Sequence, residues 1–370
     1  MDVLQPWGPS VTFARHYSTA WAQGAGSTTE VSSLGPGWSH TWSSCLVLSA
    51  GGPPASRVVL RHADTSSEEY NLGTGGYVSR HASKTLTWDA MTQLYTAQRP
   101  DGSAQVFDAQ GRLRVLRSAD GGEAQLRYAG ADTACTVSAT LPAGQLCRVD
   151  FLFNRQLWLR YDTAGHLAAV AWDSAFTSVI TSFGYTGAQL TSAPAADATA
   201  ETYAYEFNHT HLTAGITVPL LTKATDADGK VVEAFGYLQP AQSPSRVSSH
   251  ATPDATYSFQ WAYYETVGTS TRVVRETTVR GTRENLKLTW ADGALTSVCR
   301  LDENGSCDIT KRQEFVRTPG FLENLCERES SGKFRRTERD AFGRVSAEYP
   351  GLASCDVVSD ASRAHARYSI

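Results

Sequence analysis

The strict alternation of apolar and polar residues constrains the fold of this chain more than any other feature. Tyr203, Tyr205 and Phe207 occupy alternate positions, and residues 257–263 and 286–290 show the same period of two. Because successive side chains of a β-strand point to opposite faces, such segments form strands with one buried and one solvated face. No long window shows the 3.6-residue period of a helix. The pattern therefore predicts an all-β protein of antiparallel strands with almost no helix.

A turn formula recurs between these predicted strands. It consists of an acidic or polar residue, one or two variable residues, a glycine, a mostly polar residue and an apolar one. It occupies residues 107–113, 161–167, 185–190, 226–231, 290–295, 330–334 and 340–345. Glycine supplies the positive φ of a tight turn, and the preceding aspartate can accept a backbone hydrogen bond across it.

The turn glycines also reveal a repeat. Gly165, Gly187, Gly229, Gly293 and Gly332 are separated by 22, 42, 64 and 39 residues, close to multiples of 21. A unit of about 21 residues, with two strands and two turns, is therefore repeated along the chain. One hairpin cannot bury its own apolar face. We therefore expect successive hairpins to stack into a curved antiparallel β-hairpin array.

The first hundred residues differ from the rest in composition. They contain six of the 14 prolines, a glycine-rich loop and strands of irregular spacing. We interpret residues 1–100 as an irregular β cap and residues 101–370 as the repeat array. No linker rich in proline, serine or charge separates them, so one continuous body is expected.

The seven cysteines point to an oxidising compartment. The predicted disulfide bonds are Cys135–Cys147, Cys299–Cys307 and Cys326–Cys355. The first two pairs bracket turn-rich loops that reverse the chain and bring the two cysteines together. Reduced, buried cysteines are the alternative, and the lack of C-x-x-C pairs argues against zinc. Cys45 lies in an apolar run and is expected to be a buried thiol.

Charge and hydropathy exclude two classes of partner. The net charge is −4, from 37 acidic and 33 basic residues spread along the chain without a basic stripe, so no nucleic acid is expected. No apolar run is long enough for a membrane span. The N-terminal residues lack the basic region and apolar core of a signal peptide, which leaves any export route unknown.

No motif of known catalytic chemistry is present. The sequence lacks a G-x-S-x-G elbow, an H-E-x-x-H helix, a phosphate loop and a redox C-x-x-C. Neighbouring acids such as Glu68 and Glu69 fit glycosidase chemistry only if folding places two across a cleft. His209 and His211 share a strand face without a visible third metal ligand. We therefore expect no catalytic residues, no cofactor and no metal.

Two triplets match the acceptor pattern for N-linked glycosylation. They are Asn208-His209-Thr210 and Asn304-Gly305-Ser306. Such triplets often arise by chance and matter only in a suitable secretory pathway.

Residues 13–48 contain an Arg-x-Tyr-Ser element followed by Leu-Gly-x-Gly-Trp and an aromatic strand. The positions are Arg15, Tyr17, Ser18, Leu34, Gly35, Gly37, Trp38 and Trp42. This segment resembles the entry segment of bacterial Rhs and YD-repeat proteins, relatives of the shell components of insecticidal ABC-type toxin complexes and of the animal teneurins. The aromatic-Asp repeat is best preserved at Phe107-Asp108 with Gly111 and at Tyr161-Asp162 with Gly165. The similarity covers nearly the whole chain, but the later repeats are degraded. The C-terminal core block and variable toxin of the family are absent from this sequence.

The resemblance implies a non-enzymatic shell or scaffold segment of an exported, toxin-related bacterial protein, secreted or at the cell surface. Its partner would be a toxin or other polypeptide, or further segments of a longer shell. The alternative is a cell-surface recognition module in which aromatic residues such as Trp7 and Trp21 bind carbohydrate or protein. A β-rich hydrolase is a third hypothesis, which requires two carboxylates in one pocket.

Overall fold

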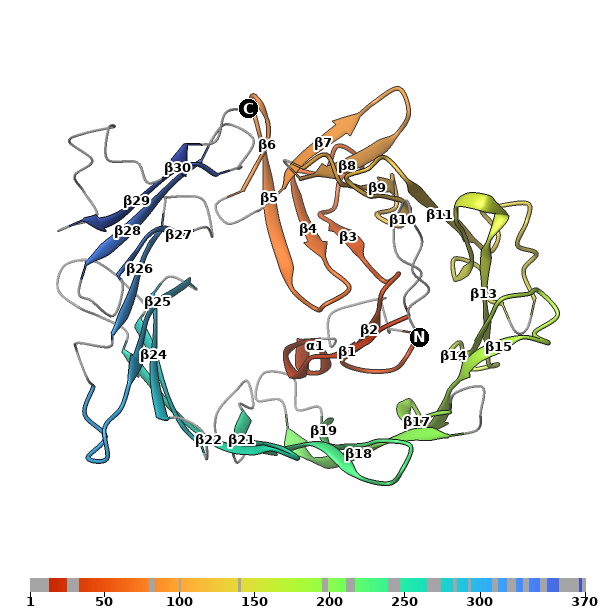
Figure 1. Ribbon diagram of the computed structural model, residues 1–370. Coiled ribbons are helices and arrows are strands. Elements are labelled where there is room, and N and C mark those ends of the chain that lie inside the picture. Colours follow the sequence, from red (N-terminus) through yellow and green to blue (C-terminus); the bar gives the residue numbers. More distant parts are fainter. Residues whose placement is uncertain are drawn as a thin grey trace. The chain divides into compact units, whose positions relative to one another are not determined.

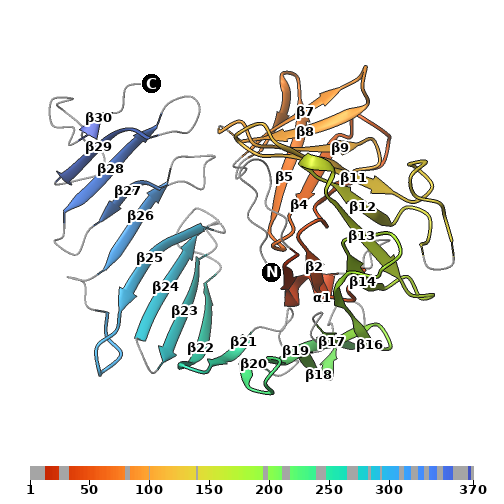
Figure 2. The ribbon, with the colours of Figure 1, turned by 45° about the vertical axis from the view of Figure 1, so that its right-hand side comes forward.

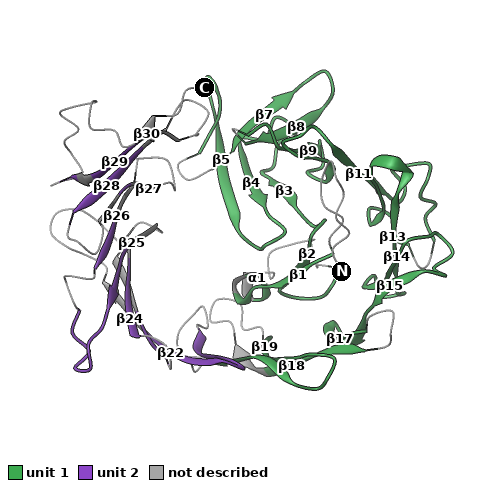
Figure 3. Ribbon diagram, viewed as in Figure 1, with its two compact units in different colours: residues 1–79, 84–246 green, residues 80–83, 247–370 purple. Residues whose placement is uncertain are grey.

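The computed structural model describes most of the chain as two compact units. The described residues are 13–24, 33–79, 84–99, 101–138, 141–194, 199–210, 217–238, 247–264, 274–281, 285–291, 294–307, 312–317, 324–328, 333–339, 345–352 and 366–367. Unit 1 comprises Met1–Ser79 and Lys84–Arg246, and unit 2 comprises Arg80–Ser83 and Val247–Ile370 (Figure 3).

The predicted all-β fold is confirmed. Within the described ranges, helical structure is limited to α1 (Thr19–Gly24) and a 3-10 turn at Leu152–Asn154. Strands that follow one another in the chain pair side by side and antiparallel, as the hairpin pattern predicts. Burial follows the polar–apolar alternation of the sequence: in Glu123–Tyr128, every second residue is buried.

Unit 1 begins with two small sheets. The first sheet pairs β1 (Arg15–Tyr17) with β2 (Trp38–His40). The second sheet contains β3 (Cys45–Leu48), β4 (Arg57–Arg61), β5 (Ser67–Gly73) and β6 (Gly76–Val78) in that order. We call the described residues 13–24 and 33–48 the cap segment. Figure 1 shows the elements of the cap segment, β1, α1, β2 and β3, on one face of the later strands of unit 1.

The rest of unit 1 is a meander of hairpins in two sheets. The first sheet contains β7 (Thr85–Asp89), β8 (Leu94–Gln98), β9 (Ala104–Asp108), β10 (Leu113–Arg117), β11 (Glu123–Tyr128), β12 (Leu146–Asp150), β13 (Gln156–Tyr161), β14 (Leu167–Ala171) and β15 (Val179–Ser182). The strands of the second are β16 (Gly184–Thr186), β17 (Gln189–Pro194), β18 (Ala200–Thr210), β19 (Thr217–Thr225) and β20 (Val231–Tyr237).

Unit 2 continues the same hairpin pattern, and Figure 2 shows its strands side by side. The strands are β21 (Val247–Thr252), β22 (Ala255–Tyr264), β23 (Val274–Gly281), β24 (Asn285–Ala291), β25 (Ala294–Arg300), β26 (Gln313–Arg317), β27 (Asn324–Arg328), β28 (Phe334–Arg339), β29 (Val345–Leu352) and β30 (Ala366–Arg367).

The repeated turn formula works as predicted where the structure describes it. Oδ1 of Asp108, Asp162 and Asp226 each accepts the backbone N–H of the second and fourth residues that follow. The glycine of each turn has a φ between 79° and 87°. Both features close the hairpin from local sequence alone. The predicted turns at 290–295, 330–334 and 340–345 include residues outside the described ones.

The predicted boundary at residue 100 does not coincide with a division between compact units. β8 and β9 pair across it over Leu94–Gln98 and Ala104–Asp108. Backbone hydrogen bonds between Arg99 and Ser103 close this hairpin, so the strand array runs through the boundary without interruption.

Candidate functional site

A row of five tyrosines connects the successive hairpins of unit 1. Each phenol donates a hydrogen bond of 2.5–2.8 Å to the backbone carbonyl of a leucine 15–18 residues earlier in the chain. The pairs are Tyr128–Leu113, Tyr161–Leu146, Tyr185–Leu167, Tyr205–Leu190 and Tyr237–Leu221. We call these residues the tyrosine row.

The row supplies hydrogen-bond donors to the backbone carbonyls at the ends of three turn formulas. Leu113, Leu167 and Leu190 are the last residues of three formulas, and all three are buried. A buried carbonyl without a partner is costly, and the phenol of a following hairpin supplies that partner. Burial raises the pKa of Tyr161, so its hydroxyl stays protonated and continues to donate. Each repeat is thereby bonded to an earlier one.

The cap segment lies on the tyrosine row and binds to it through backbone groups. The Ser33 carbonyl accepts hydrogen bonds from the N–H of Leu167, at 2.6 Å, and from the Tyr185 hydroxyl, at 3.3 Å. Further along, the Leu46 N–H donates to the Gly111 carbonyl at 2.8 Å. Main-chain groups of the cap segment thus form part of its contact with the hairpin array.

Trp38 and Tyr17 are the aromatic anchors of the cap segment. Trp38 Nε1 donates to the Tyr205 hydroxyl at 2.8 Å, and its ring meets Tyr17 and Tyr203 edge-on, with centroids 5.3 and 4.8 Å away. The Leu221 N–H donates to the Tyr17 hydroxyl at 3.1 Å. Burial raises the pKa of Tyr17 to about 12, against the smaller opposing effect of that hydrogen bond.

Three glycines lie where the backbone is closely packed: Gly35 and Gly111 between the cap segment and the hairpin array, and Gly37 within the cap segment. A Cβ on Gly35 would lie 2.2 Å from the Ala188 carbonyl oxygen, and one on Gly111 would lie 2.1 Å from that of Leu46. A Cβ on Gly37 would meet the Tyr17 ring at 2.7 Å. All three glycines also have a φ near +90°, which disfavours any larger residue.

Of the fourteen residues that the resemblance singles out, six meet at this contact and four lie elsewhere. Leu34, Trp42 and Phe107 are buried, and the Ser18 N–H donates to the Gly37 carbonyl within the cap segment. Those at the contact are Arg15, Tyr17, Gly35, Gly37, Trp38 and Gly111. Arg15 pairs with Glu201 at 2.7 Å and lies over the Phe183 ring. Tyr161 belongs to the tyrosine row away from these anchors. Asp108, Asp162 and Gly165 act in their own turns, and a Cβ on Gly165 would meet nothing within 4 Å.

Four tyrosines of the row were missed by sequence reasoning, which singled out Tyr161 alone. They are Tyr128, Tyr185, Tyr205 and Tyr237. For Tyr128, Tyr185 and Tyr205 the usable signal is a tyrosine 15–18 residues after the leucine that ends a turn formula. Tyr237 carries no such signal, because its partner Leu221 lies inside β19.

Ser33 and His40 form a close pair without the arrangement of a nucleophile and its base. His40 Nδ1 accepts the Trp42 N–H at 3.2 Å, which places the ring proton on Nε2. Nε2, 3.4 Å from Ser33 Oγ, is therefore a donor to that oxygen and not its base. Burial lowers the pKa of His40 to about 4, so the ring is neutral at pH 7. The pair stabilises the cap segment.

Glu68 and Glu69 do not form a catalytic pair. Glu69 is exposed and receives two hydrogen bonds from Arg57, at 2.7 and 2.8 Å. Glu68 points to the opposite face of β5, where it accepts the Tyr70 hydroxyl and lies 3.8 Å from Lys84 Nζ. Strand alternation separates the two carboxylates.

The described residues contain neither a cluster of metal ligands nor a helix able to span a membrane. Within the described residues, no group of three or more His, Cys, Asp or Glu side chains is arranged to hold a metal ion. The side chains of His209 and His211 lie outside the described residues. No helix in the described part of the chain is long and apolar enough to cross a membrane.

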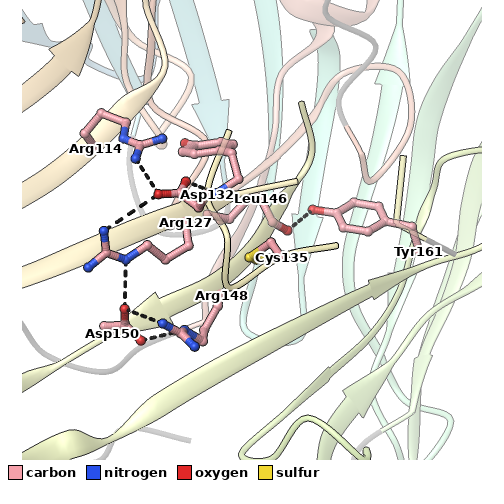
Figure 4. The surroundings of a disulfide bond; sticks show 10 residues. Arg114, Arg127, Asp132, Cys135, Leu146, Arg148, Asp150 and Tyr161 are labelled. Carbon is pink, nitrogen blue, oxygen red and sulfur yellow. Dashed lines mark hydrogen bonds and ion pairs between the residues drawn. A yellow bond between two sulfur atoms is a disulfide. The ribbon is translucent and has the colours of Figure 1, made fainter. Parts of the chain in front are cut away.

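The Cys135–Cys147 disulfide anchors the loop between β11 and β12 beside a chain of ion pairs (Figure 4). Both cysteines are buried. Asp132, in the same loop, accepts the Tyr128 N–H and pairs with Arg114 at 2.8 Å. Burial alone would raise the pKa of Asp132, but these two donors outweigh it and hold the pKa below its usual value.

The ion pairs continue from this loop across β11 and β12. Arg127 lies 3.8 Å from Asp132 and donates to Asp150 at 3.0 Å, and Arg148 contacts Asp150 at 2.7 Å (Figure 4). Charges of opposite sign alternate along this network, so it offers no free basic surface to a ligand.

The other cysteines follow the spacing argument as far as the structure describes them. Cys299 and Cys307 are joined around the turn that contains Asn304. Cys326 is disulfide-bonded and buried, and its predicted partner Cys355 lies outside the described residues. Cys45 is not disulfide-bonded and is half-buried, whereas a buried thiol was expected; its neighbour Leu46 takes the buried position.

We expect each of the two described disulfides to add about 2–3 kcal/mol to the free energy of unfolding, because each closes a short loop in the unfolded chain. The pairs C135A/C147A and C299A/C307A should therefore lower the urea midpoint of their own unit. Non-reducing peptide mapping should find both bridges in protein from an oxidising compartment. Free thiols at all four positions would contradict the expectation and indicate a reducing compartment.

Replacing Trp38 by alanine should cost unit 1 about 3–5 kcal/mol, because the side chain is buried among Tyr17, Tyr203 and Tyr205. W38F keeps a ring there and loses the Nε1–H donor, so about 1–2 kcal/mol is expected. Urea unfolding of both variants provides the measurement. Equal stabilities for W38A and the wild-type chain would show that the cap segment is not anchored at this residue.

No protein-family model matches this sequence, and no curated protein matches it. Among solved structures, similarity is found to crystal structures of TcdB2-TccC3. The TcdB2-TccC3-TEV structure matches 85% of this chain at 10% identity, with a TM-score of 0.35. TcdB2-TccC3 itself matches 80% at 9% identity, with a TM-score of 0.24. The form without the hypervariable C-terminal region matches 86% at 10% identity, with a TM-score of 0.20.

These matches extend over most of this chain but over little of the other proteins. The chain spans 20%, 17% and 23% of the three TcdB2-TccC3 chains. TM-scores of this size do not establish a shared fold.

Proposed function

We propose that this chain is a non-enzymatic structural segment of an exported, toxin-related shell of the Rhs type, which encloses or presents another polypeptide. The observation that carries the proposal is the cap segment bound along the tyrosine row. There, one face of the hairpin array holds a polypeptide through main-chain groups such as the Ser33 carbonyl and the Leu46 N–H. The main-chain part of this contact does not depend on side-chain identity, which suits a wall around other polypeptides, and the cap segment adds its own aromatic anchors, Trp38 and Tyr17.

Several features agree with this role. The turn formula extends the array by adding hairpins, so the wall grows without a new fold for each segment. The Arg and Asp side chains near the Cys135–Cys147 bridge neutralise one another, which stiffens the array. The two described disulfides agree with an extracellular location.

No tryptophan whose side chain the structure describes is among the exposed large apolar residues. Trp21 is half-buried with the Arg61 guanidinium 5.6 Å from its ring centroid, and Trp7 lies outside the described residues. The exposed large apolar side chains in the described part of the chain are Leu72, Val78, Met91, Val137, Phe153 and Val231. None of these is a tryptophan on which a sugar ring could stack.

The products of the adjacent open reading frames provide the test. Each would be co-expressed with the full chain, purified as a complex and exposed to protease, with M91A as a control variant whose changed side chain is 95% exposed. We expect one product to co-purify at a fixed ratio and to resist cleavage only in the complex. Failure of every product to bind or to be protected, together with binding of the chain to a glycan array, would overturn the shell role in favour of recognition.

A further inference from the structure

Both asparagine acceptor triplets of this chain have an acidic residue two positions before the asparagine. Glu206 precedes Asn208, and Asp302 precedes Asn304. Asp302 opens an Asp-x-x-Gly turn like those at Asp108, Asp162 and Asp226, so the turn itself accounts for the acid before Asn304. Oligosaccharyltransferases of the bacterial type bind acceptors with an acid at this position. The pattern therefore fits one class of modifying enzyme.

The structure separates the two triplets. Asn208 lies within β18, at a shift of register between the pairs Glu206–Leu220 and His209–Val218 with β19. Paired residues on both sides hold this segment in the sheet, whereas an oligosaccharyltransferase must bend the acceptor segment into its active site. Asn304 lies instead in the turn after β25, and all five residues from Asp302 to Ser306 are exposed. The second triplet is therefore the one placed in an exposed turn.

The turn at Asn304 holds the acceptor in a defined shape. Asp302 Oδ1 accepts the N–H groups of Asn304 and Ser306 at 2.9 and 2.7 Å, and Gly305 adopts a φ of +78°. The Cys299–Cys307 bridge closes the hairpin just behind this turn. That bridge also requires an oxidising compartment, which is where N-linked glycosylation takes place.

We propose that Asn304 is an N-glycosylation site that a bacterial-type oligosaccharyltransferase recognises through Asp302, Asn304 and Ser306. The asparagine Nδ2 displaces a lipid-linked pyrophosphate from the first sugar of the oligosaccharide, forming one N–C bond and releasing one proton and the lipid pyrophosphate. A glycan at this hairpin end leaves both faces of the sheet free, so the modification is compatible with a structural wall.

The test exports the full chain to a bacterial periplasm that contains such an enzyme and one defined lipid-linked oligosaccharide. A C-terminal Asp-x-Asn-x-Thr tag on the same chain reports that the enzyme is active. Peptide mass spectrometry should find the peptide with Asn304 heavier by the mass of one oligosaccharide and the peptide with Asn208 unmodified. N304Q and S306A should lose the added mass, and S306T should keep it.

D302N is the sharpest variant. An asparagine can accept the same two backbone N–H bonds, so the turn persists while the negative charge is lost. We expect D302N to form the Cys299–Cys307 bridge normally and to lose the glycan. Unmodified Asn304 in bridged protein whose tag is glycosylated would overturn the proposal. So would modification of Asn208 instead, or a gain of only one mass unit at Asn304, which indicates spontaneous deamidation of Asn304-Gly305.

Discussion

Replacing Gly111 by alanine is expected to destabilise unit 1 by about 3–5 kcal/mol, whereas the same change at Gly165 should cost about 1 kcal/mol. Both glycines occupy the same place in the turn formula, with φ values of +83° and +87°. The backbone penalty for alanine is therefore the same at the two sites. The difference comes from the surroundings of the added methyl group.

At Gly111 the new Cβ would lie 2.1 Å from the Leu46 carbonyl oxygen, and at Gly165 nothing lies within 4 Å. The clash forces the cap segment away and breaks the Leu46 N–H bond to the Gly111 carbonyl. Urea unfolding followed by tryptophan fluorescence measures the effect, with the transitions of the two units treated separately. If G111A and G165A were equally stable, the cap segment would not rest on this turn in solution.

Unit 1 should lose most of its stability between pH 10 and pH 11. Burial raises the pKa of all five tyrosines of the row above the usual value of about 10. The folded state therefore keeps protons that the unfolded state releases, so stability is fully present below pH 10 and falls as the pH rises. Each tyrosine contributes up to about 1.4 kcal/mol per pH unit, and five reach about 7 kcal/mol at pH 11. That sum is comparable to the whole stability of a typical domain.

Phenolate absorbance and circular dichroism, followed together against pH, provide the measurement. The five phenols of the tyrosine row should lose their protons in one cooperative step, together with the loss of the β-strand signal in circular dichroism. Return to pH 8 should restore the protonated phenols and the strand signal. Y161F leaves one tyrosine fewer in the row. Above pH 10, the free energy of unfolding of this variant should therefore decrease less steeply than that of the wild-type chain, by about 1.4 kcal/mol per pH unit. Phenols that titrate near pH 10 while the strand signal stays constant would show that water reaches the row.

Local features of the sequence determine the strands and turns. The alternation around Tyr203 and the Asp-x-x-Gly formula at Asp108, Asp162 and Asp226 predict elements that the structure contains. The reason is physical range: an aspartate that accepts N–H groups two and four residues ahead needs no distant partner. The cysteine pairs belong to the same class, because the turns between Cys135 and Cys147 and between Cys299 and Cys307 bring each pair together.

Only the tertiary structure decides what the glycines and tyrosines do. Gly111 and Gly165 are equivalent in sequence, yet only Gly111 carries the cap segment, through Leu46. Trp38 meets Tyr205 across 167 residues, and Tyr17 meets Leu221 across 204. No local pattern encodes such pairs, because the partner of a buried polar group depends on which strands fold against one another. The same reason separates the two acceptor asparagines: their sequence patterns match, but Asn208 lies within β18 between residues paired with β19, whereas Asn304 lies in an exposed turn.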